Sequence, residues 1–127
     1  MNPEFIRTSE EVGDWFSDSV YDWEKNQYKK DYPVPTDIEV LAAYYTYEDY
    51  TGDCTVYFRQ DGKLYYAGGS HCSCNGLEGQ WSPDEIDLPY LKMLLNAGSF
   101  EKKEYYDTAP SGFHDHMQAV VEKLESE

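Results

Sequence analysis

The residues best suited to chemistry lie in and beside one glycine-rich loop, residues 69–81, which reads Gly-Ser-His-Cys-Ser-Cys-Asn-Gly-Leu-Glu-Gly-Gln-Trp. A predicted strand runs just before this loop, and its pairing with the preceding strand places Cys54 opposite about Gly68, near the start of the loop. Three cysteines and one histidine would then lie close together: Cys54, His71, Cys72 and Cys74. Three thiolates and one imidazole are a known ligand set for zinc.

Other interpretations of these residues stay open. Structural zinc sites normally use a Cys-x2–4-Cys spacing, whereas Cys72 and Cys74 are separated by one residue. The cysteines would otherwise be small buried hydrophobic residues, and we expect no cofactor unless zinc binds. A nucleophilic Cys72 activated by His71 is a further alternative. Because neighbouring strand residues point to opposite faces, this pair supports an enzyme only weakly, and we expect none.

The first predicted element is a helix over residues 8–30. Thr8 and Glu11 have the spacing of a capping box. Apolar residues recur at the spacing of one helical face: Val12, Trp15, Phe16, Val20 and Trp23. Two prolines, Pro33 and Pro35, end the pattern because neither can continue a helix.

Residues 37–68 alternate apolar and polar side chains and predict an antiparallel meander of three strands, 38–47, 54–59 and 63–68. Gly62 suits the left-handed position of a three-residue hairpin loop, a register that sets Phe58 opposite Leu64. One face of the sheet is then apolar, and the other is rich in tyrosine. We expect that second face either to lie open to a partner or to be covered by a helix.

Two more helices are predicted after the loop. Ser82-Pro83-Asp84-Glu85 is typical of a helix start, and Pro89 then marks either a kink or a second start capped by Asp87. This helix ends at residues 96–98, and a last helix runs from Ser111 to about Leu124. His114 and His116 diverge on that helix, which favours a solvated surface position for both. The predicted fold is α+β, with a three-stranded antiparallel meander packed with an N-terminal helix and two C-terminal helices. It forms one domain over residues 1–127, with residues 1–7 and 125–127 frayed.

Charge is the second informative feature, because the chain carries 25 acidic and 10 basic residues and a formal net charge of -15. Such a surface repels the phosphates of nucleic acid, so direct nucleic-acid binding is not expected. It suits instead a protein groove that is itself basic, although acidity can also serve solubility alone. No apolar run approaches the roughly 20 residues of a membrane helix, and the start lacks a signal-peptide pattern, so we expect no membrane and a cytoplasmic location.

The block from Asp61-Gly62-Lys63-Leu64-Tyr65 through the loop to Trp81-Ser82-Pro83 resembles a functionally uncharacterised family of small phage and prophage proteins. The resemblance covers roughly residues 40–95 and is specific in residues 69–81. It implies a bacteriophage origin and the cytoplasm of the infected host as the place of action. It implies no catalytic residues, and much of the acidity lies outside it.

These features predict an acidic protein that inhibits a host or defence nucleic-acid-binding protein through its basic groove, with DNA or RNA mimicry of the anti-CRISPR or anti-restriction type as one route. The alternative is a small accessory phage protein whose loop binds zinc or another ligand. The oligomeric state is left open. The expected contact residues are acidic or aromatic: Glu10, Glu11, Asp14, Asp18, Asp22, Glu24, Tyr45, Tyr47, Glu48, Asp49, Tyr57 and Tyr65.

Overall fold

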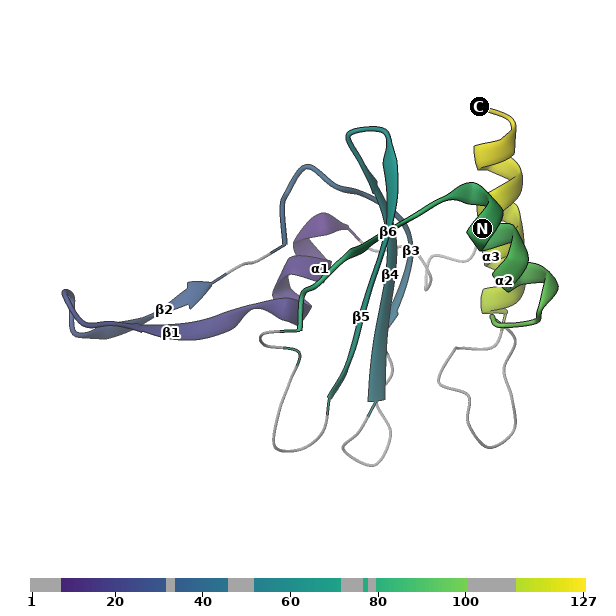
Figure 1. Cartoon of the computed structure of the whole chain (residues 1–127). Helices are drawn as coiled ribbons and strands as arrows, with labels where there is room; N and C mark the ends of the chain where they lie inside the picture. Colours follow the sequence, from purple (N-terminus) through teal and green to yellow (C-terminus); the bar gives the residue numbers. More distant parts are fainter. Residues whose placement is uncertain (1–7, 32–33, 46–51, 72–76, 78–79, 101–111) are drawn as a thin grey trace.

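The computed structural model describes residues 8–31, 34–45, 52–71, 77, 80–100 and 112–127. Over these residues the fold is α+β, as expected, but its main sheet has four antiparallel strands in the order β3-β4-β5-β6. A separate two-stranded hairpin, β1-β2, extends away from this sheet (Figure 1). The helices and strands are α1 (Ser9–Phe16), β1 (Asp18–Asp22), β2 (Gln27–Asp31), β3 (Glu39–Tyr45), β4 (Gly52–Gln60), β5 (Lys63–His71), β6 (Asp84–Ile86), α2 (Leu88–Asn96) and α3 (Phe113–Glu125).

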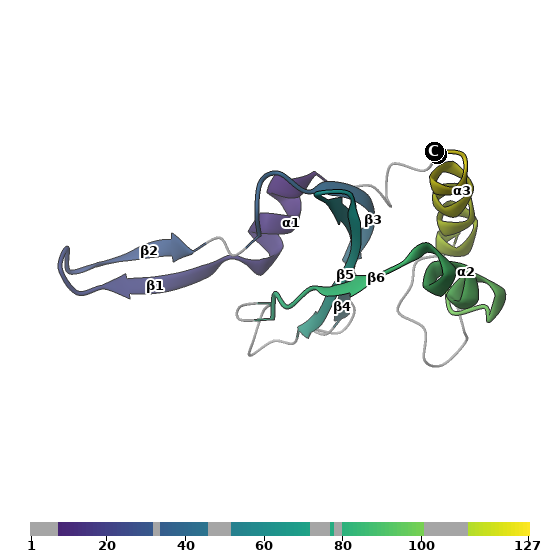
Figure 2. The ribbon, with the colours of Figure 1, turned by 45° about the horizontal axis from the view of Figure 1, so that its top comes forward.

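The main sheet is buried on both faces, because helices lie on either side of it (Figure 2). On the side that we call the α1 face, α1 packs Val12 and Phe16 against a cluster that includes Val56 and Phe58. On the side that we call the α3 face, α2 and α3 pack against a second cluster that includes Tyr57. The meander prediction was therefore right about the antiparallel strands but missed β6, and of the two alternatives for the second face, cover by helices is the correct one.

A β-bulge in β3 sets which residues reach each face. The register shifts between Val40, which pairs with Phe58, and Ala42, which pairs with Tyr57. Val40 therefore packs with the α1 cluster, whereas Leu41 and Ala42 both pack with the α3 cluster. The predicted uninterrupted alternation through β3 was wrong, because a bulge inserts one unpaired residue and reverses the faces beyond it.

The β4-β5 hairpin has a two-residue turn, and the predicted three-residue loop was wrong. Gln60 pairs with Lys63, and the turn residues Asp61 and Gly62 have φ angles of 53° and 77°. These are the positive φ values of a type I′ turn, whose twist matches that of the strands.

The two-residue turn sets Arg59 opposite Leu64, in place of the predicted pairing of Phe58 with Leu64. Arg59 lies near the end of β4, with its guanidinium 2.7 Å from a Glu39 carboxylate oxygen, and it also pairs with Glu127. The charge therefore stays solvated and paired. The contact also ties the end of the chain, which we had expected to be frayed, to β4.

This register also separates the tyrosines that the sequence had placed on one face. Tyr57 pairs with Tyr66 on the α3 face, whereas Tyr65 pairs with Phe58 on the α1 face. The placing of Tyr57 and Tyr65 on one tyrosine-rich face was therefore wrong, and Tyr47 lies outside the described residues.

The predicted helix over residues 8–30 holds only for its first eight positions. Thr8 caps α1, since its Oγ1 accepts a hydrogen bond of 3.1 Å from the Glu11 N–H, as the capping-box spacing predicted. The chain leaves the helix at Ser17, whose φ and ψ are extended, and continues as the β1-β2 hairpin. Asp22 stabilises the tip of that hairpin, because its Oδ1 accepts hydrogen bonds from the N–H groups of Glu24 and Lys25.

The C-terminal half distinguishes between a helix kinked at Pro89 and a second helix start capped by Asp87. Residues 84–86 form β6 rather than the start of a helix, so the start predicted at Ser82 was wrong. The second start is correct, because the Asp87 side chain accepts a hydrogen bond from the Tyr90 N–H and Pro89 lies in the first turn of α2. Gly98, at φ 71°, follows the helix end as expected, and α3 follows Gly112.

Two glycine substitutions should have opposite effects on stability. Gly62→Ala should lower the free energy of unfolding by about 1–2 kcal/mol, because an alanine at positive φ is strained even though nothing lies within 4 Å of the new Cβ. Gly13→Ala should raise it by about 0.5–1 kcal/mol, because alanine favours helix and its Cβ would lie 3.9 Å from that of Val34, an ordinary contact. Urea denaturation measures both, and two effects of the same sign would contradict the assigned backbone conformations.

Candidate functional site

The predicted acidic contact residues fall mainly on α1 and the hairpin beside it. Glu10, Glu11 and Asp14 are exposed on α1, on the side away from the buried Val12 and Phe16. At the hairpin, Glu24 is exposed and Asp22 is half-buried, with its carboxylate occupied by the turn. The side chain of Asp18 lies outside the described part of the structure, as do Glu48 and Asp49.

The β1-β2 hairpin, which we call the arm, projects from the body of the molecule (Figures 1 and 2). It carries exposed aromatic side chains. Trp23 is 84% exposed and Tyr28 is 72% exposed. Tyr21 packs edge-to-face against both, with ring centroids 4.5 Å from Trp23 and 5.1 Å from Tyr28. We call Tyr21, Trp23 and Tyr28 the arm cluster. Exposed aromatic residues gathered at one place are typical of an interaction site.

The sequence had assigned Trp23 to the buried face of a helix, and it had not singled out Tyr28. The signal that favours the arm is local. Tyr21 and Tyr28 pair directly across the two strands, and Asn26 adopts a φ of 53° that asparagine tolerates in turns. Val20 and Trp23 continue the helical spacing of residues 12–16, so the apolar pattern alone could not show that the helix ends before them.

The other predicted contact residues are placed differently. Tyr45 is exposed and lies against Trp15, with ring centroids 5.4 Å apart. Tyr57 is only 6% exposed, and Tyr65 stacks on Phe58 with centroids 5.2 Å apart. Tyr57 and Tyr65 therefore pack in the core. Within the described residues, Tyr45 is the exposed member of this group.

The proposed zinc ligands are only partly described. Cys54 is buried and pairs with Gly69, one residue beyond the expected Gly68. His71 ends β5 opposite Gly52, but its side chain, like Cys72 and Cys74, lies outside the described residues. Within the described residues, no group of three or more potential ligands comes together. Zinc binding by this set therefore stays a prediction.

Burial makes the Cys54 thiol a poor nucleophile. Its pKa is raised to about 12, first by burial and then by the nearby charge of Asp53. A thiol with such a pKa is almost entirely protonated near neutral pH, so Cys54 lacks the thiolate that catalysis needs.

His116 is buried, and its predicted surface position was wrong. It is 5% exposed and packs beside Phe113 in the core between α3 and the sheet. Burial lowers its pKa below the ordinary value of 6.5, and a hydrogen bond with the Leu41 backbone partly opposes that change. The imidazole is therefore neutral at physiological pH.

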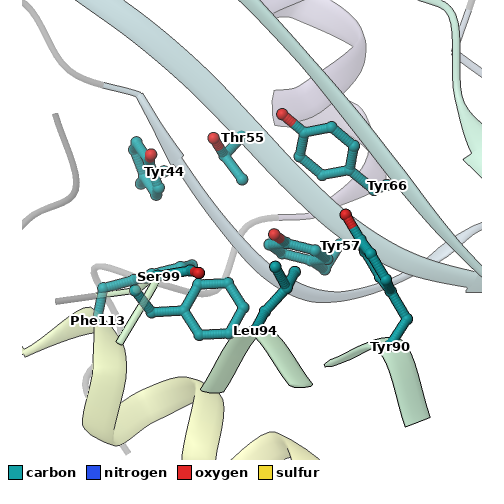
Figure 3. A pocket seen from close by; sticks show the side chains of 9 residues that line it. Tyr44, Thr55, Tyr57, Tyr66, Tyr90, Leu94, Ser99 and Phe113 are labelled. Atoms are coloured by element: carbon teal, nitrogen blue, oxygen red, sulfur yellow. The ribbon is translucent and has the colours of Figure 1, made fainter. Parts of the chain in front are cut away.

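A cavity of about 310 Å³ opens between the α3 face of the sheet and the α2 helix (Figure 3). It is lined mainly by aromatic and hydroxyl-bearing side chains: Tyr44, Thr55, Tyr57, Tyr66, Tyr90, Leu94, Ser99, Phe100 and Phe113. The sequence reasoning missed this site. Its residues come from positions 44 to 113, and only the sheet register and the α2 position bring them together.

No family model, curated protein or solved structure matches this chain. Nor does any helix in the described part of the chain have the length and apolar character needed to cross a membrane.

A variant with Cys54 as its sole thiol, made by Cys72→Ser and Cys74→Ser, should label slowly. At pH 8 we expect reaction with a disulfide reagent to be roughly a hundredfold or more slower than that of free glutathione, because both burial and protonation protect the sulfur. The denatured variant is the control and should label at the rate of a free thiol. Rapid labelling of the folded variant would contradict the burial of Cys54.

His116 should make stability depend on pH. Its folded-state pKa lies below its unfolded value, so the unfolded chain takes up the proton first as the pH falls. The contribution of the neutral imidazole is therefore fully present above pH 6.5 and is lost as the pH drops below that value. Urea denaturation between pH 5 and 8 should show a steeper loss on the acid side for the wild type than for His116→Gln. Equal slopes would contradict a buried neutral histidine.

Proposed function

We propose that this chain is a phage-encoded acidic interaction protein that inhibits a host or defence nucleic-acid-binding protein by occupying its basic groove. The contact surface consists of the exposed carboxylates of α1 and the arm cluster. The observation that supports this most directly is the exposed Trp23 and Tyr28 on a projecting arm next to an acidic helix.

Charge is concentrated on this part of the chain. Residues 8–24 contain six acidic residues and no lysine or arginine: Glu10, Glu11, Asp14, Asp18, Asp22 and Glu24. The lysines of the arm, Lys25, Lys29 and Lys30, lie in its turn and returning strand. We therefore assign the electrostatic attraction to α1 and the apolar anchoring to the arm cluster.

Only some of the carboxylates of α1 favour the helix itself. Glu10 and Glu11 lie in the first turn, where negative charge favours a helix, but Asp14 lies near the C-terminal end, where it is unfavourable. Glu10 and Asp14 are also one turn apart, a spacing at which like charges repel. A basic partner would relieve both costs, because its lysines and arginines would replace the repulsion with attraction.

The aromatic residues supply what charge alone does not. Electrostatic attraction speeds association and is screened by salt, whereas large buried aromatic side chains slow dissociation. Trp23 and Tyr28 are exposed in the free protein, so binding can bury their rings without opening the core. Their edge-to-face packing on Tyr21 holds the rings in place before contact.

The test starts by capturing a partner from bacterial host extract at low salt. That partner is then identified and purified. Against it, Glu10→Lys with Asp14→Lys should slow association about tenfold and flatten its salt dependence, because steering is lost. Trp23→Ala should weaken binding by roughly 30-fold, mainly through faster dissociation. Surface plasmon resonance measures both rates.

The matched control reverses the charge of two carboxylates that lie outside α1 and the arm. Asp84 and Glu122 are exposed on β6 and α3, so Asp84→Lys with Glu122→Lys makes the same change in net charge. Binding that falls equally in both double variants would show that net charge alone matters. Unchanged binding in the α1 variant would exclude α1 as the contact.

A further inference from the structure

The tyrosine-lined cavity has the construction of an aromatic cage. Six aromatic rings line it: Tyr44, Tyr57, Tyr66, Tyr90, Phe100 and Phe113. Several meet at steep angles rather than in a stack. The Tyr44 and Phe113 planes cross at 80°, and those of Tyr57 and Phe100 cross at 89°. These pairs are in edge-to-face contact, and together they border the cavity of about 310 Å³; Figure 3 shows Tyr57, Tyr90 and Phe113 around the same opening.

The walls come from elements that the fold holds firmly. Tyr57 and Tyr66 are cross-strand partners on β4 and β5, so their spacing is fixed by the sheet. Phe113 is 1% exposed at the start of α3. Tyr90 lies at the mouth, 43% exposed in the first turn of α2, and reaches toward the sheet tyrosines. The cage therefore has a rigid floor and one accessible wall.

The chemistry of the lining selects against anions and favours a weakly hydrated cation. The described lining residues include no lysine, arginine, aspartate or glutamate. Electron-rich ring faces attract cations, and this attraction is largest where water is excluded. A compact ion such as sodium would lose its hydration shell without carboxylates to replace it. A methylated ammonium is weakly hydrated, because its charge is spread over apolar methyl groups.

We propose that this cage binds a methylated ammonium group, either on a small molecule such as choline or on a methylated lysine side chain. The volume of about 310 Å³ lies at the small end of ligand pockets, which fits one such head group.

The titration behaviour of the lining is consistent with this choice. The pKa values of Tyr57 and Tyr66 are both raised, first by burial and then by neighbouring tyrosines. The phenols therefore stay neutral at physiological pH, and the surroundings oppose any further negative charge in the cavity. The strongly acidic chain adds a long-range attraction for cations.

This inference does not rest on the proposed function. The cage lies on the α3 face, with α2 and α3, whereas the proposed partner surface lies with α1 and the arm on the other side of the sheet. The two sites can be tested separately, and either can fail alone.

The test compares choline with 3,3-dimethylbutan-1-ol, a neutral molecule of nearly the same shape. Binding to the full chain is followed through amide chemical shifts of Leu94 and Ser99, which line the cavity. We expect choline to bind about tenfold more tightly than the neutral alcohol, in the range of a desolvated cation–π contact. Equal affinities, or no shift with either molecule, would overturn the proposal.

Variants of the accessible wall identify the cause. Tyr90→Ala should weaken choline binding at least fivefold, whereas Tyr90→Phe, which keeps the ring, should stay within about twofold. Tyr28→Ala removes a more exposed ring far from the cavity and should have no effect on choline binding. A large loss in Tyr90→Phe would indicate hydrogen bonding to the hydroxyl and would contradict a cage.

A peptide with trimethyllysine distinguishes the two sources of the group. Tighter binding of this peptide than of choline, with the unmethylated peptide much weaker, would assign the cage to a modified protein. Equal or weaker binding of the peptide would assign it to a free small molecule.

Discussion

The pairing of β4 with β5 is the constraint on which the rest of the structure depends. It sets Tyr57 beside Tyr66 on the α3 face and Phe58 beside Tyr65 on the α1 face, so neighbours in sequence join different clusters. A slip of one residue would exchange the two faces and leave both clusters incomplete. The Asp61-Gly62 turn fixes this register, because its positive φ angles allow only a two-residue connection.

A sheet covered on both faces gives the molecule two separate surfaces. On one side, α1 anchors Phe16 against the sheet and Trp81, and the chain then leaves as the arm. On the other, α2 and α3 cover most of the sheet and leave the tyrosine-lined cavity. Within the described residues, the strands of the arm pair only with each other. Two-stranded hairpins are marginally stable alone. The packing of Tyr21 on Trp23 and Tyr28 therefore supports both the shape of the arm and its exposed aromatic surface.

Some local signals in the sequence predicted the structure correctly. The Thr8 cap and the helix stop before Gly98 were predicted, and the Asp87 cap with Pro89 was one of two alternatives. The helix start at Ser82 and the three-residue loop at residues 60–62 were wrong, because β6 and the strand register decide both. The bulge at Leu41, the burial of His116 and the cavity depend on partners far along the chain, so no local pattern could indicate them. The arm was missed for a different reason. Val20 and Trp23 continue the helical spacing of α1, and only the pairing of residues 18–22 with 27–31 shows that the chain has left the helix.

The most direct test of the account is a competition on the identified partner. A labelled nucleic acid bound in the partner's groove is titrated with this protein, at several salt concentrations. The account predicts displacement in proportion to the protein bound, with an affinity that falls as salt rises. A ternary complex, in which the protein binds while the nucleic acid stays in the groove, would contradict it.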